Sequence, residues 1–413
     1  MTDATPRIVF VGASADWSTI DVSNGYRDAL RAAGAEVHEV KFNRRIINMG
    51  GFLGLEPSAR NLVQISRHAS RSMVPDAIEF EPDWVLIISA MAFHPDAVVL
   101  LKRAGLRVGV IFTESPYSDP DMQEFASLCD FVATNDRHSA EKYGWLHLPA
   151  AYNPDRHHLV DVAGFNLAKR MAWKHETDEW AAACDIARAT FEPTSCLGCK
   201  RSLPGPVLPD SPEEPWAIPQ HDVVLVGTGW AERVTRLKQV DWTGIDFAIY
   251  GCWPQLDDNR DNLDYEHAAG ITDDEEGREK LGRYYTKLPT ENDQTVALYS
   301  GAKIVLNDHR DHPDAYSCNP RVYEALAVGG GLLLTDYRPE IKDLLGDLWP
   351  HFVFNSPGEL QALIHYFIEH EDERQRLVKY GQERVRQHTF AERTSTLLRA
   401  LEAATVREEV SVG

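Results

Sequence analysis

Short apolar runs alternate along most of the chain with longer stretches in which apolar residues recur at helical spacing. In the first part of the chain, the runs that predict strands are 8–11, 37–40, 84–88, 108–113, 131–134 and 145–149. The stretches between them that predict helices include 24–33, 95–104 and 136–143. Continuous apolar runs of this length are typical of parallel strands covered on both faces, and their alternation with helices predicts a doubly wound sheet.

The last part of the chain repeats this pattern. Strands are predicted at 223–226, 247–250, 303–306, 332–336 and 352–354. Helices are predicted at 291–300, 359–370, 371–387 and 391–404. The sequence therefore predicts an α/β protein with two Rossmann-like parallel sheets, each with its own core. In such sheets ligands bind beyond the carboxyl ends of the strands.

The alternation fails between residues 153 and 220. A helical stretch at about 168–189 is followed by a proline-rich segment at 204–219. Such a composition is typical of an insertion with a linker. We therefore divide the chain into a first domain at 1–155, an insertion and linker at 156–220, a second domain at 221–388 and a final helical segment at 389–413.

Charge and composition exclude several classes of protein. The 413 residues carry a formal net charge of −21, with 43% apolar and 25% charged residues. A balance this acidic disfavours a constitutive binder of nucleic acid or of an anionic membrane. No apolar run approaches the length of a membrane span, and the N-terminus lacks the apolar region of a signal peptide. With six scattered cysteines, we expect a cytoplasmic protein, in the host cytoplasm if it is viral.

One cysteine pair has the spacing of a metal site. Cys196 and Cys199 resemble half of a zinc knuckle, and Cys184 with a histidine such as His157 would have to supply the other half. The sequence has no second closely spaced pair, and Cys184 also fits a buried helical position. This argues against a structural zinc ion.

The stretch from Ser317 to Asp336 predicts a loop, a helix and a buried strand. Asn319 suits the N-cap of that helix, and proline follows at its first position. A helix start of this kind presents free N–H groups and a positive dipole end, which suit a phosphate. Arg321 adds a cation in the first turn, and Glu324 lies on the same face, where its carboxylate suits the hydroxyls of a ribose. The alternative is that Arg321 and Glu324 only form an intrahelical ion pair.

A second helix start has similar properties. The loop containing Gly227 and Gly229 follows a strand and opens a helix that carries Arg233, and Lys238 lies near its end. These cations suit a diphosphate, although a solvated basic face is the alternative interpretation. The further candidates for donor binding lie at a strand end or just before the 320s helix, and they are Asn307, Arg310 and Ser317.

Two carboxylates in predicted strand-end loops of the first domain are candidates for a general base. They are Asp16 and Glu114, with His94 and His147 as alternatives. The structural alternative is that Asp16 caps a turn and that Glu114 is solvated. The incomplete glycine pattern after the first strand argues against a nicotinamide cofactor.

With these residues placed, the chain resembles the group 1 glycosyltransferases of GT-B architecture, and among them the CgeB-like, spore-maturation type. The motifs that carry the resemblance are 319–327 with the glycines after it, 303–307 with Arg310, 227–233, and 388–390 with Arg393. The resemblance covers roughly 220–400, and more loosely 7–155.

The resemblance implies two domains that face a central cleft, with the segment 389–413 crossing back to the first domain. It implies that Glu324 holds the donor ribose and that Arg233 with Lys238 holds the diphosphate. It also implies that no metal or cofactor is required, because a helix dipole and cations stabilise the leaving diphosphate. The family usually has a carboxylate eight residues before the ribose-binding one, and Tyr316 stands there in this chain.

The sequence thus predicts a transferase that moves a sugar from a nucleotide-diphosphate sugar to a hydroxyl of a small molecule, a protein or modified DNA. One alternative is a phage-type enzyme that glycosylates a hydroxymethylated base in DNA, for which Arg44, Arg45, Lys102 and Arg103 are the basic candidates. The other is a module that binds a nucleotide-sugar or a protein without turnover.

Overall fold

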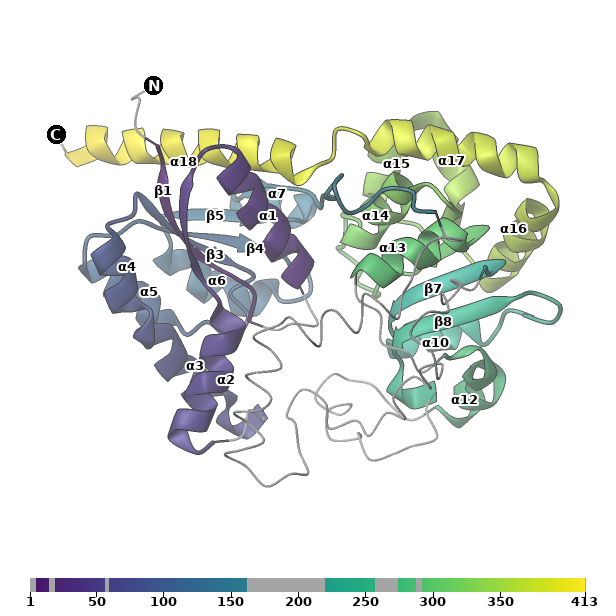
Figure 1. Ribbon diagram of the computed structural model, residues 1–413, viewed down its shortest axis with the longest axis horizontal. Helices are drawn as coiled ribbons and strands as arrows, with labels where there is room; N and C mark the ends of the chain where they lie inside the picture. The colour runs from purple at the N-terminus through teal and green to yellow at the C-terminus, as the bar shows by residue number, and fades with distance from the viewer. Residues whose placement is uncertain are drawn as a thin grey trace.

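The computed structural model describes residues 5–14, 19–55, 59–161, 220–256, 274–286 and 292–412. Asp16 and the three cysteines considered for zinc lie outside these residues, as does most of the predicted insertion. The described chain forms two lobes that lie side by side, each built on a parallel sheet covered by helices (Figure 1). The domain boundaries assigned from the sequence remain predictions.

The first sheet has six parallel strands in the order β2-β1-β3-β4-β5-β6. The strands are β1 Arg7–Val11, β2 Glu36–Val40, β3 Trp84–Ile88, β4 Val108–Phe112, β5 Phe131–Thr134 and β6 Leu146–His147. All residues of β3 and β4 are buried, as expected for strands with helices on both sides. The six predicted strands are therefore confirmed. β6 is shorter than the apolar run at 145–149 that predicted it.

Helices α1 Ile20–Ala32, α5 Pro95–Arg103 and α7 Arg137–Tyr143 lie at predicted positions, and α6 Asp119–Leu128 follows β4. The segment between β2 and β3, for which the sequence analysis made no prediction, forms three helices. They are α2 Phe42–Leu53, α3 Ala59–Ser72 and α4 Val74–Phe80.

The second sheet has five parallel strands in the order β11-β10-β9-β7-β8. They are β7 Val223–Thr228, β8 Phe247–Cys252, β9 Ile304–Asn307, β10 Leu332–Asp336 and β11 Val353–Phe354. The helices of this domain are α10 Ala231–Leu237, α12 Glu275–Leu281, α13 Asn292–Gly301, α14 Pro320–Val328, α15 Pro339–Leu345, α16 Pro357–Glu369 and α17 Glu371–Val385. Short 3-10 turns occur at η1 Pro254–Leu256, η3 Gly282–Tyr284 and η4 Gly346–Phe352.

The last helix, α18 Phe390–Val412, lies along the first domain, as Figure 1 shows in yellow. The ring of Phe390 packs so closely on Gly25 of α1 that a Cβ there would lie 2.3 Å from ring atoms. Further along, Trp84 Nε1 donates to Thr405 Oγ1 at 3.2 Å. The predicted return of the C-terminal helix to the first domain is confirmed.

The chain crosses between the domains at two places that lie side by side. On the way out, Tyr152 donates its N–H to the carbonyl of His388 at 3.1 Å. On the way back, Phe390 donates its N–H to the carbonyl of Tyr152 at 3.2 Å. The outgoing segment continues onto the second domain, where the N–H of Val160 donates to Ser300 Oγ at 3.2 Å. The two crossings therefore form one hydrogen-bonded junction.

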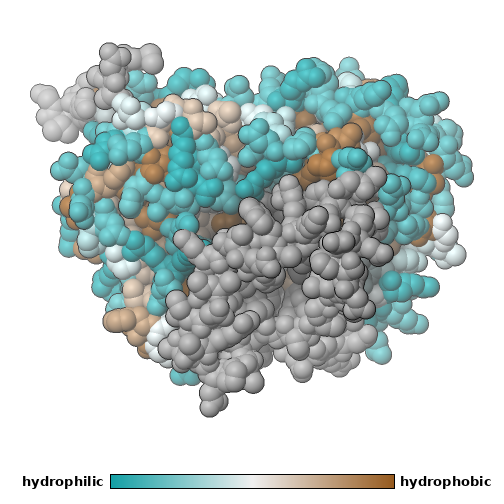
Figure 2. Space-filling model, viewed as in Figure 1, coloured by the Kyte–Doolittle hydropathy of each residue, from teal (hydrophilic) through white to brown (hydrophobic). Residues whose placement is uncertain are grey.

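The surface seen in Figure 2 is mainly hydrophilic, with scattered apolar patches, as expected for a chain of strongly negative net charge. None of the described helices combines the length and the apolar character needed to cross a membrane.

Candidate functional site

The amino end of α14 is held by a chain of polar side chains at the carboxyl ends of β9 and β10. Asn319 Oδ1 accepts the N–H of Val322 at 3.4 Å, so Asn319 is the predicted N-cap. Its Nδ2 donates to Asn307 Oδ1 at 3.0 Å, and Asn307 Nδ2 donates to Thr335 Oγ1 at 2.9 Å. The structure thus brings together Asn307 and Asn319, both predicted to bind the donor, in a position that fixes the direction of the helix.

Arg321, in the first turn of α14, lies beside the glycine loop after β7, where a Cβ on Gly227 would be 3.6 Å from its Nε. Burial alone would lower the pKa of its guanidinium, but Tyr299, Glu324 and Asp21 more than reverse this effect and raise it. Asp21 belongs to the first turn of α1, in the other domain. The charge of Arg321 is therefore influenced by an acidic residue of the first domain as well as by its neighbours in the second.

Glu324, one turn further along, is nearly buried, with 9% of its surface exposed. Burial raises the pKa of its carboxyl, and the charge of Arg321 opposes that rise. Nε2 of His157 lies 4.0 Å from Glu324 Oε1. His157 Nδ1 accepts the N–H of Asn153 at 3.0 Å, so the proton of the neutral ring is on Nε2 and faces the carboxylate.

Burial lowers the pKa of His157 to about 4, so its imidazole is neutral at pH 7. The sequence analysis considered His157 only as a zinc ligand. Its isolated position in a non-repeating segment gave no signal of a contact with α14.

The glycine loop after β7 lies against two arginines. A Cβ on Gly227 would lie 3.0 Å from Arg233 Nη1 and 3.6 Å from Arg321 Nε. A Cβ on Gly229 would overlap the ring of Trp253 at 2.6 Å. Glycine is needed at 229 because the loop backbone runs directly over that ring. The predicted diphosphate residues Gly227, Arg233 and Arg321 are thus close together.

The guanidinium of Arg233 is buried and is held by backbone carbonyls. It donates to the carbonyl of Thr228 at 2.5 Å and to the carbonyl of Asp308, while its Nε has no partner among the described residues. Burial lowers its pKa, Asp308 opposes this, and Arg321 adds to the lowering. Arg233 therefore ties the ends of β7 and β9 together and places positive charge beneath the glycine loop.

Lys238 has different neighbours. Its Nζ lies 2.9 Å from Asp274 Oδ2 and 3.0 Å from Glu276 Oε2, at the start of α12. The structure therefore pairs Lys238 with α12 rather than with residues of the α14 end, and its role with a diphosphate remains a prediction.

The loop after β9 is anchored by a buried acid–histidine pair. His309 Nδ1 lies 2.6 Å from Asp336 Oδ1, and the N–H of His309 donates to the same oxygen at 2.8 Å. Burial would raise the pKa of Asp336, but His309 and then Arg338 hold it well below its usual range. This pair, which the sequence analysis did not identify, fixes the loop that carries Arg310.

Arg310 connects the two domains. Its guanidinium carbon lies 5.2 Å from the ring centroid of Tyr117 in the first domain and 4.9 Å from that of Trp230 in the second. The Tyr117 hydroxyl donates to the Arg310 carbonyl at 2.8 Å. Burial raises the pKa of Glu114, and the charge of Arg310 opposes that rise. The loop that carries the predicted base Glu114 and the loop that carries Arg310 therefore meet at the domain boundary, through the contact of Tyr117 with Arg310.

The carboxyl edge of the first sheet carries buried polar side chains without partners among the described residues. Oγ of Ser89, Oγ1 of Thr113 and Oδ1 of Asn135 are the relevant atoms, at the ends of the neighbouring strands β3, β4 and β5. Ser89 also has a left-handed φ of 74°, which is uncommon for a residue with a side chain. Unpaired buried polar atoms and a strained backbone are features of ligand sites.

Of the two histidine alternatives, His94 has a structural role within the described residues. His94 Nδ1 accepts the N–H of Asp96 at 3.2 Å, which makes His94 the cap of α5. Burial lowers the pKa of His147, whose Nε2 has no partner in the described chain.

Ser317 and Tyr316 contact the first domain. Asp136 Oδ2 accepts the N–H groups of both residues at 2.9 Å, and Ser317 Oγ accepts the N–H of Arg137 at 3.3 Å. The Tyr316 hydroxyl lies 2.5 Å from Asp343 Oδ2 and 3.2 Å from Arg137 Nη1. Tyr316 stands where the resembled family usually has a carboxylate. In this chain it is therefore part of the interdomain contact.

The four basic residues considered for a DNA acceptor do not form one surface. Lys102 forms an ion pair with Asp130, whose other oxygen accepts the N–H of Val108 at the amino end of β4. Lys102 and the neighbouring Arg103 therefore lie at the edge opposite the expected ligand side. Arg45, in α2 after the carboxyl end of β2, is paired with Asp76. Within the described residues no group of three or more acidic, histidine or cysteine side chains is arranged to hold a metal ion.

Part of the chain matches a known protein family. Residues 214–399 match the model of a family described as "Glycosyl transferase-like". Curated protein sequences give no match.

Several solved structures have a similar fold. α,α-Trehalose 6-phosphate synthase from Burkholderia multivorans aligns over 99% of this chain and 98% of its own, at 11% identity and a TM-score of 0.55. Sucrose-phosphate synthase from Thermosynechococcus elongatus aligns over 97% and 100%, at 12% identity and a TM-score of 0.55. An Escherichia coli trehalose-6-phosphate protein, bound with UDP-2-fluoro glucose, aligns over 96% and 98%, at 11% identity and a TM-score of 0.55. The predicted GT-B fold is confirmed.

Proposed function

We propose that this protein transfers a sugar from a nucleotide-diphosphate sugar, held by the second domain, to an acceptor hydroxyl held by the first. The observation that carries the proposal is the position of Arg321. It lies at the amino end of α14, beside Gly227. The charge of Asp21, in the other domain, contributes to the raised pKa of its guanidinium. A helix start, an arginine and a glycine loop that converge on an interdomain space suit a diphosphate.

The donor is oriented by groups around this point. Arg321 and the loop at Gly227 and Gly229 bind the diphosphate, and buried Arg233 adds positive charge beneath them. Glu324 accepts the ribose hydroxyls. Asn307, Arg310, Ser317 and Asn319 shape the same wall, and Lys238 is a more distant contributor. Because one protein of similar fold is bound with UDP-2-fluoro glucose, uridine is the first nucleotide to test.

The reaction breaks the bond between the sugar C1 and the diphosphate oxygen, and that oxygen keeps the electron pair. The acceptor oxygen forms the new bond to C1, and its proton leaves. In an inverting reaction Glu114 takes this proton, because burial raises the pKa of its carboxyl and makes it a stronger base. Asp16 remains the second candidate. In a retaining reaction the leaving phosphate takes the proton, and neither carboxylate acts as a base.

We also propose that transfer needs no metal, since the helix dipole and arginines stabilise the charge that develops on the diphosphate. Within the group 1 glycosyltransferases, the 319–327 block and the ending at 388–390 favour the CgeB-like type. We expect the reaction to take place in the cytoplasm.

Calorimetric titration with uridine, guanosine, adenosine and thymidine diphosphates tests the donor site. At least one should bind, and Arg321→Gln should weaken it about tenfold or more, because a charge-assisted contact in a buried site is lost. Arg386→Gln is the matched control, because Arg386 is an exposed arginine of the same domain whose guanidinium pairs, within the described residues, with Glu383 one helical turn earlier. Equal affinities of wild type and Arg321→Gln would contradict the proposed site.

Incubation with the matching nucleotide-sugar separates an enzyme from a binding module. An enzyme should release nucleoside diphosphate, slowly with water as acceptor. Glu114→Gln should lower this rate without weakening nucleotide binding if the reaction inverts. A chain that binds the donor but releases no diphosphate over many hours, with a range of acceptors, would be a binding module.

A further inference from the structure

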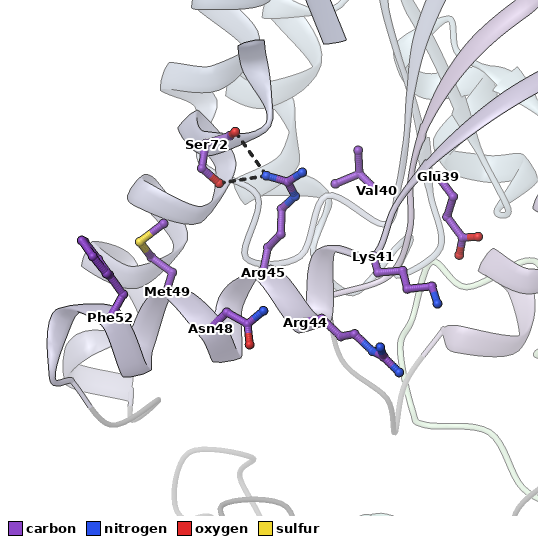
Figure 3. Close-up of a pocket in the computed structure, with 9 residues that line it drawn as sticks. All are labelled: Glu39, Val40, Lys41, Arg44, Arg45, Asn48, Met49, Phe52 and Ser72. Atoms are coloured by element: carbon purple, nitrogen blue, oxygen red, sulfur yellow. Dashed lines mark hydrogen bonds between the residues drawn. The ribbon is translucent and has the colours of Figure 1, made fainter. Parts of the chain in front are cut away.

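The first domain has a pocket that none of the functions above has used. It has a volume of about 580 Å³ and is lined by one side of α2, the end of β2 and Ser72 of α3 (Figure 3). The N–H of Gly12, just after β1, donates to the carbonyl of Val40, the last residue of β2, at 3.1 Å. The pocket therefore opens at the carboxyl edge of the first sheet, where the acceptor is expected.

The polar end of this pocket is lined by more basic than acidic side chains. Lys41, Arg44 and Arg45 line it, against one carboxylate, Glu39. Glu39 is held from its other side by Arg27 at 3.0 Å and Arg31 at 3.3 Å, so its charge is already offset.

Arg45 is directed to Ser72 and Asp76. Lys41 is exposed, and its ammonium has no ion pair or hydrogen bond within the described chain. Figure 3 shows Lys41 and Arg44 extending to the same side at the start of α2.

The other end of the pocket is apolar. Met49 lies beyond Asn48, and Phe52 is 85% exposed at the last turn of α2. Lys41, Asn48 and Phe52 recur at helical spacing, so the cationic and apolar ends lie along one side of the same helix. Arg44 and Met49, the nearest residues of the two ends, are roughly 7.5 Å apart along its axis at 1.5 Å per residue. An exposed aromatic ring in line with a cationic end suits a ligand with an anionic group and an apolar body.

We infer that this pocket binds the acceptor substrate, and that the acceptor is a small molecule with a phosphate or carboxylate group and an apolar portion. The anionic group lies at Lys41 and Arg44, and the apolar portion lies on Met49 and Phe52. Charge complementarity selects this occupant, because a cationic pocket in a chain with a net charge of −21 attracts anions locally. The inference that the ligand is the acceptor rests on the proposed function, but the binding site itself does not.

Calorimetry with phenyl phosphate, phenylacetate, inorganic phosphate and neutral 2-phenylethanol tests the site. The wild type should bind at least one aromatic anion and prefer it to 2-phenylethanol, with weaker binding at high salt. The two aromatic anions distinguish a phosphate from a carboxylate ligand. Lys41→Met/Arg44→Gln should weaken that anion about fivefold to tenfold, the range for two partly exposed charge contacts. Phe52→Ser should weaken the aromatic anion and leave inorganic phosphate unchanged.

The matched control is Arg103→Gln/Lys142→Met, which removes the same charge from two exposed positions of this domain. It should bind as the wild type does. Equal binding by Lys41→Met/Arg44→Gln and the wild type, or no binding of either aromatic anion by the wild type, would overturn the inference.

The same variants separate this inference from the proposed function. Lys41→Met/Arg44→Gln should bind nucleoside diphosphate normally. A wild type that binds phenyl phosphate through Lys41 but binds no nucleotide would retain the pocket and lose the proposed function. With the donor identified, transfer to 4-hydroxyphenylacetate should exceed transfer to neutral 2-(4-hydroxyphenyl)ethanol. The preference should vanish in the double variant, and its persistence there would exclude the pocket as the acceptor site.

Discussion

Nε2 of His157 lies 4.0 Å from Oε1 of Glu324, although His157 stands at the start of the predicted insertion and Glu324 in the second domain. His157 is in the outgoing crossing between the domains, and Glu324 is the candidate for holding the donor ribose. The crossing therefore lies beside the proposed donor site. Changes in this crossing are expected to affect nucleotide binding as well as the junction of the domains.

The neutral state of His157 predicts a pH dependence of stability. Burial lowers its pKa to about 4, below the value of about 6.5 expected in the unfolded chain. As the pH falls through this window, the unfolded chain takes up a proton that the native chain does not, so the free energy of unfolding decreases by up to about 3 kcal/mol.

His157→Gln should reduce this decrease in urea unfolding between about pH 7 and about pH 4. His158→Gln, at an exposed neighbouring position, is the control and should keep the wild-type dependence. The same slope in wild type and His157→Gln would show that His157 titrates normally.

Asp136 is predicted to hold the two domains together. Its buried carboxylate accepts two N–H groups of the second domain, from Tyr316 and Ser317, and also the N–H of Ser139 at 2.9 Å. In Asp136→Asn an amide group replaces one acceptor oxygen, which leaves buried donors unpaired. We expect a loss of about 2–5 kcal/mol in denaturant unfolding and a larger radius of gyration in small-angle scattering.

The control at the same interface is Asp343→Asn. Asp343 is 58% exposed and pairs with Arg137 at 3.4 Å, so its loss should cost less than about 1 kcal/mol. Similar effects of the two substitutions would mean that Asp136 has no special role in joining the domains.

Glu340 predicts an opposite pH effect. Burial raises the pKa of its carboxyl to about 7, even though the N–H of Cys318 donates to it at 2.6 Å and the Tyr323 hydroxyl also contacts it. Between about pH 4.5 and about pH 7 the native chain keeps a proton that the unfolded chain releases, so the contribution of this group to stability is lost as the pH rises.

Glu340→Gln resembles the protonated acid and still accepts the N–H of Cys318. It should be more stable than the wild type above about pH 7, by up to about 3 kcal/mol, and the difference should disappear near pH 4.5. The exposed Glu369→Gln serves as control. Parallel pH curves for the wild type and Glu340→Gln would contradict the raised pKa.

Two helical glycines should respond in opposite ways to alanine. A Cβ on Gly25 would lie 2.3 Å from the Phe390 ring, so Gly25→Ala must displace the start of α18 and should cost about 1–3 kcal/mol in denaturant unfolding. Gly51 of α2 has no atom within 4 Å of such a Cβ, so Gly51→Ala should stabilise by about 0.5–1 kcal/mol through helix propensity. A stable Gly25→Ala would show that α18 is not packed on α1 in solution.

The sequence by itself determined the elements whose signals are local. The runs at 84–88 and 131–134 became β3 and β5 without change of bounds, because a short apolar run between turn residues has few alternatives. Asn319 followed by proline marked the start of α14, because an N-cap and its first-turn proline act within a few residues. The segment 42–80 was not predicted, although it forms three helices.

Only the tertiary structure decided which distant groups meet. The contact of Asp136 with the N–H of Tyr316 joins residues 180 positions apart, and neither residue has a sequence pattern that points to the other. The sequence likewise carries no local signal that His157 faces Glu324 or that Lys238 pairs with α12. It also carries none for the pocket on α2 at the carboxyl edge of the sheet. Such contacts depend on how elements that are distant in the sequence pack together, whereas helix starts and buried strands depend on residues that are neighbours in the chain.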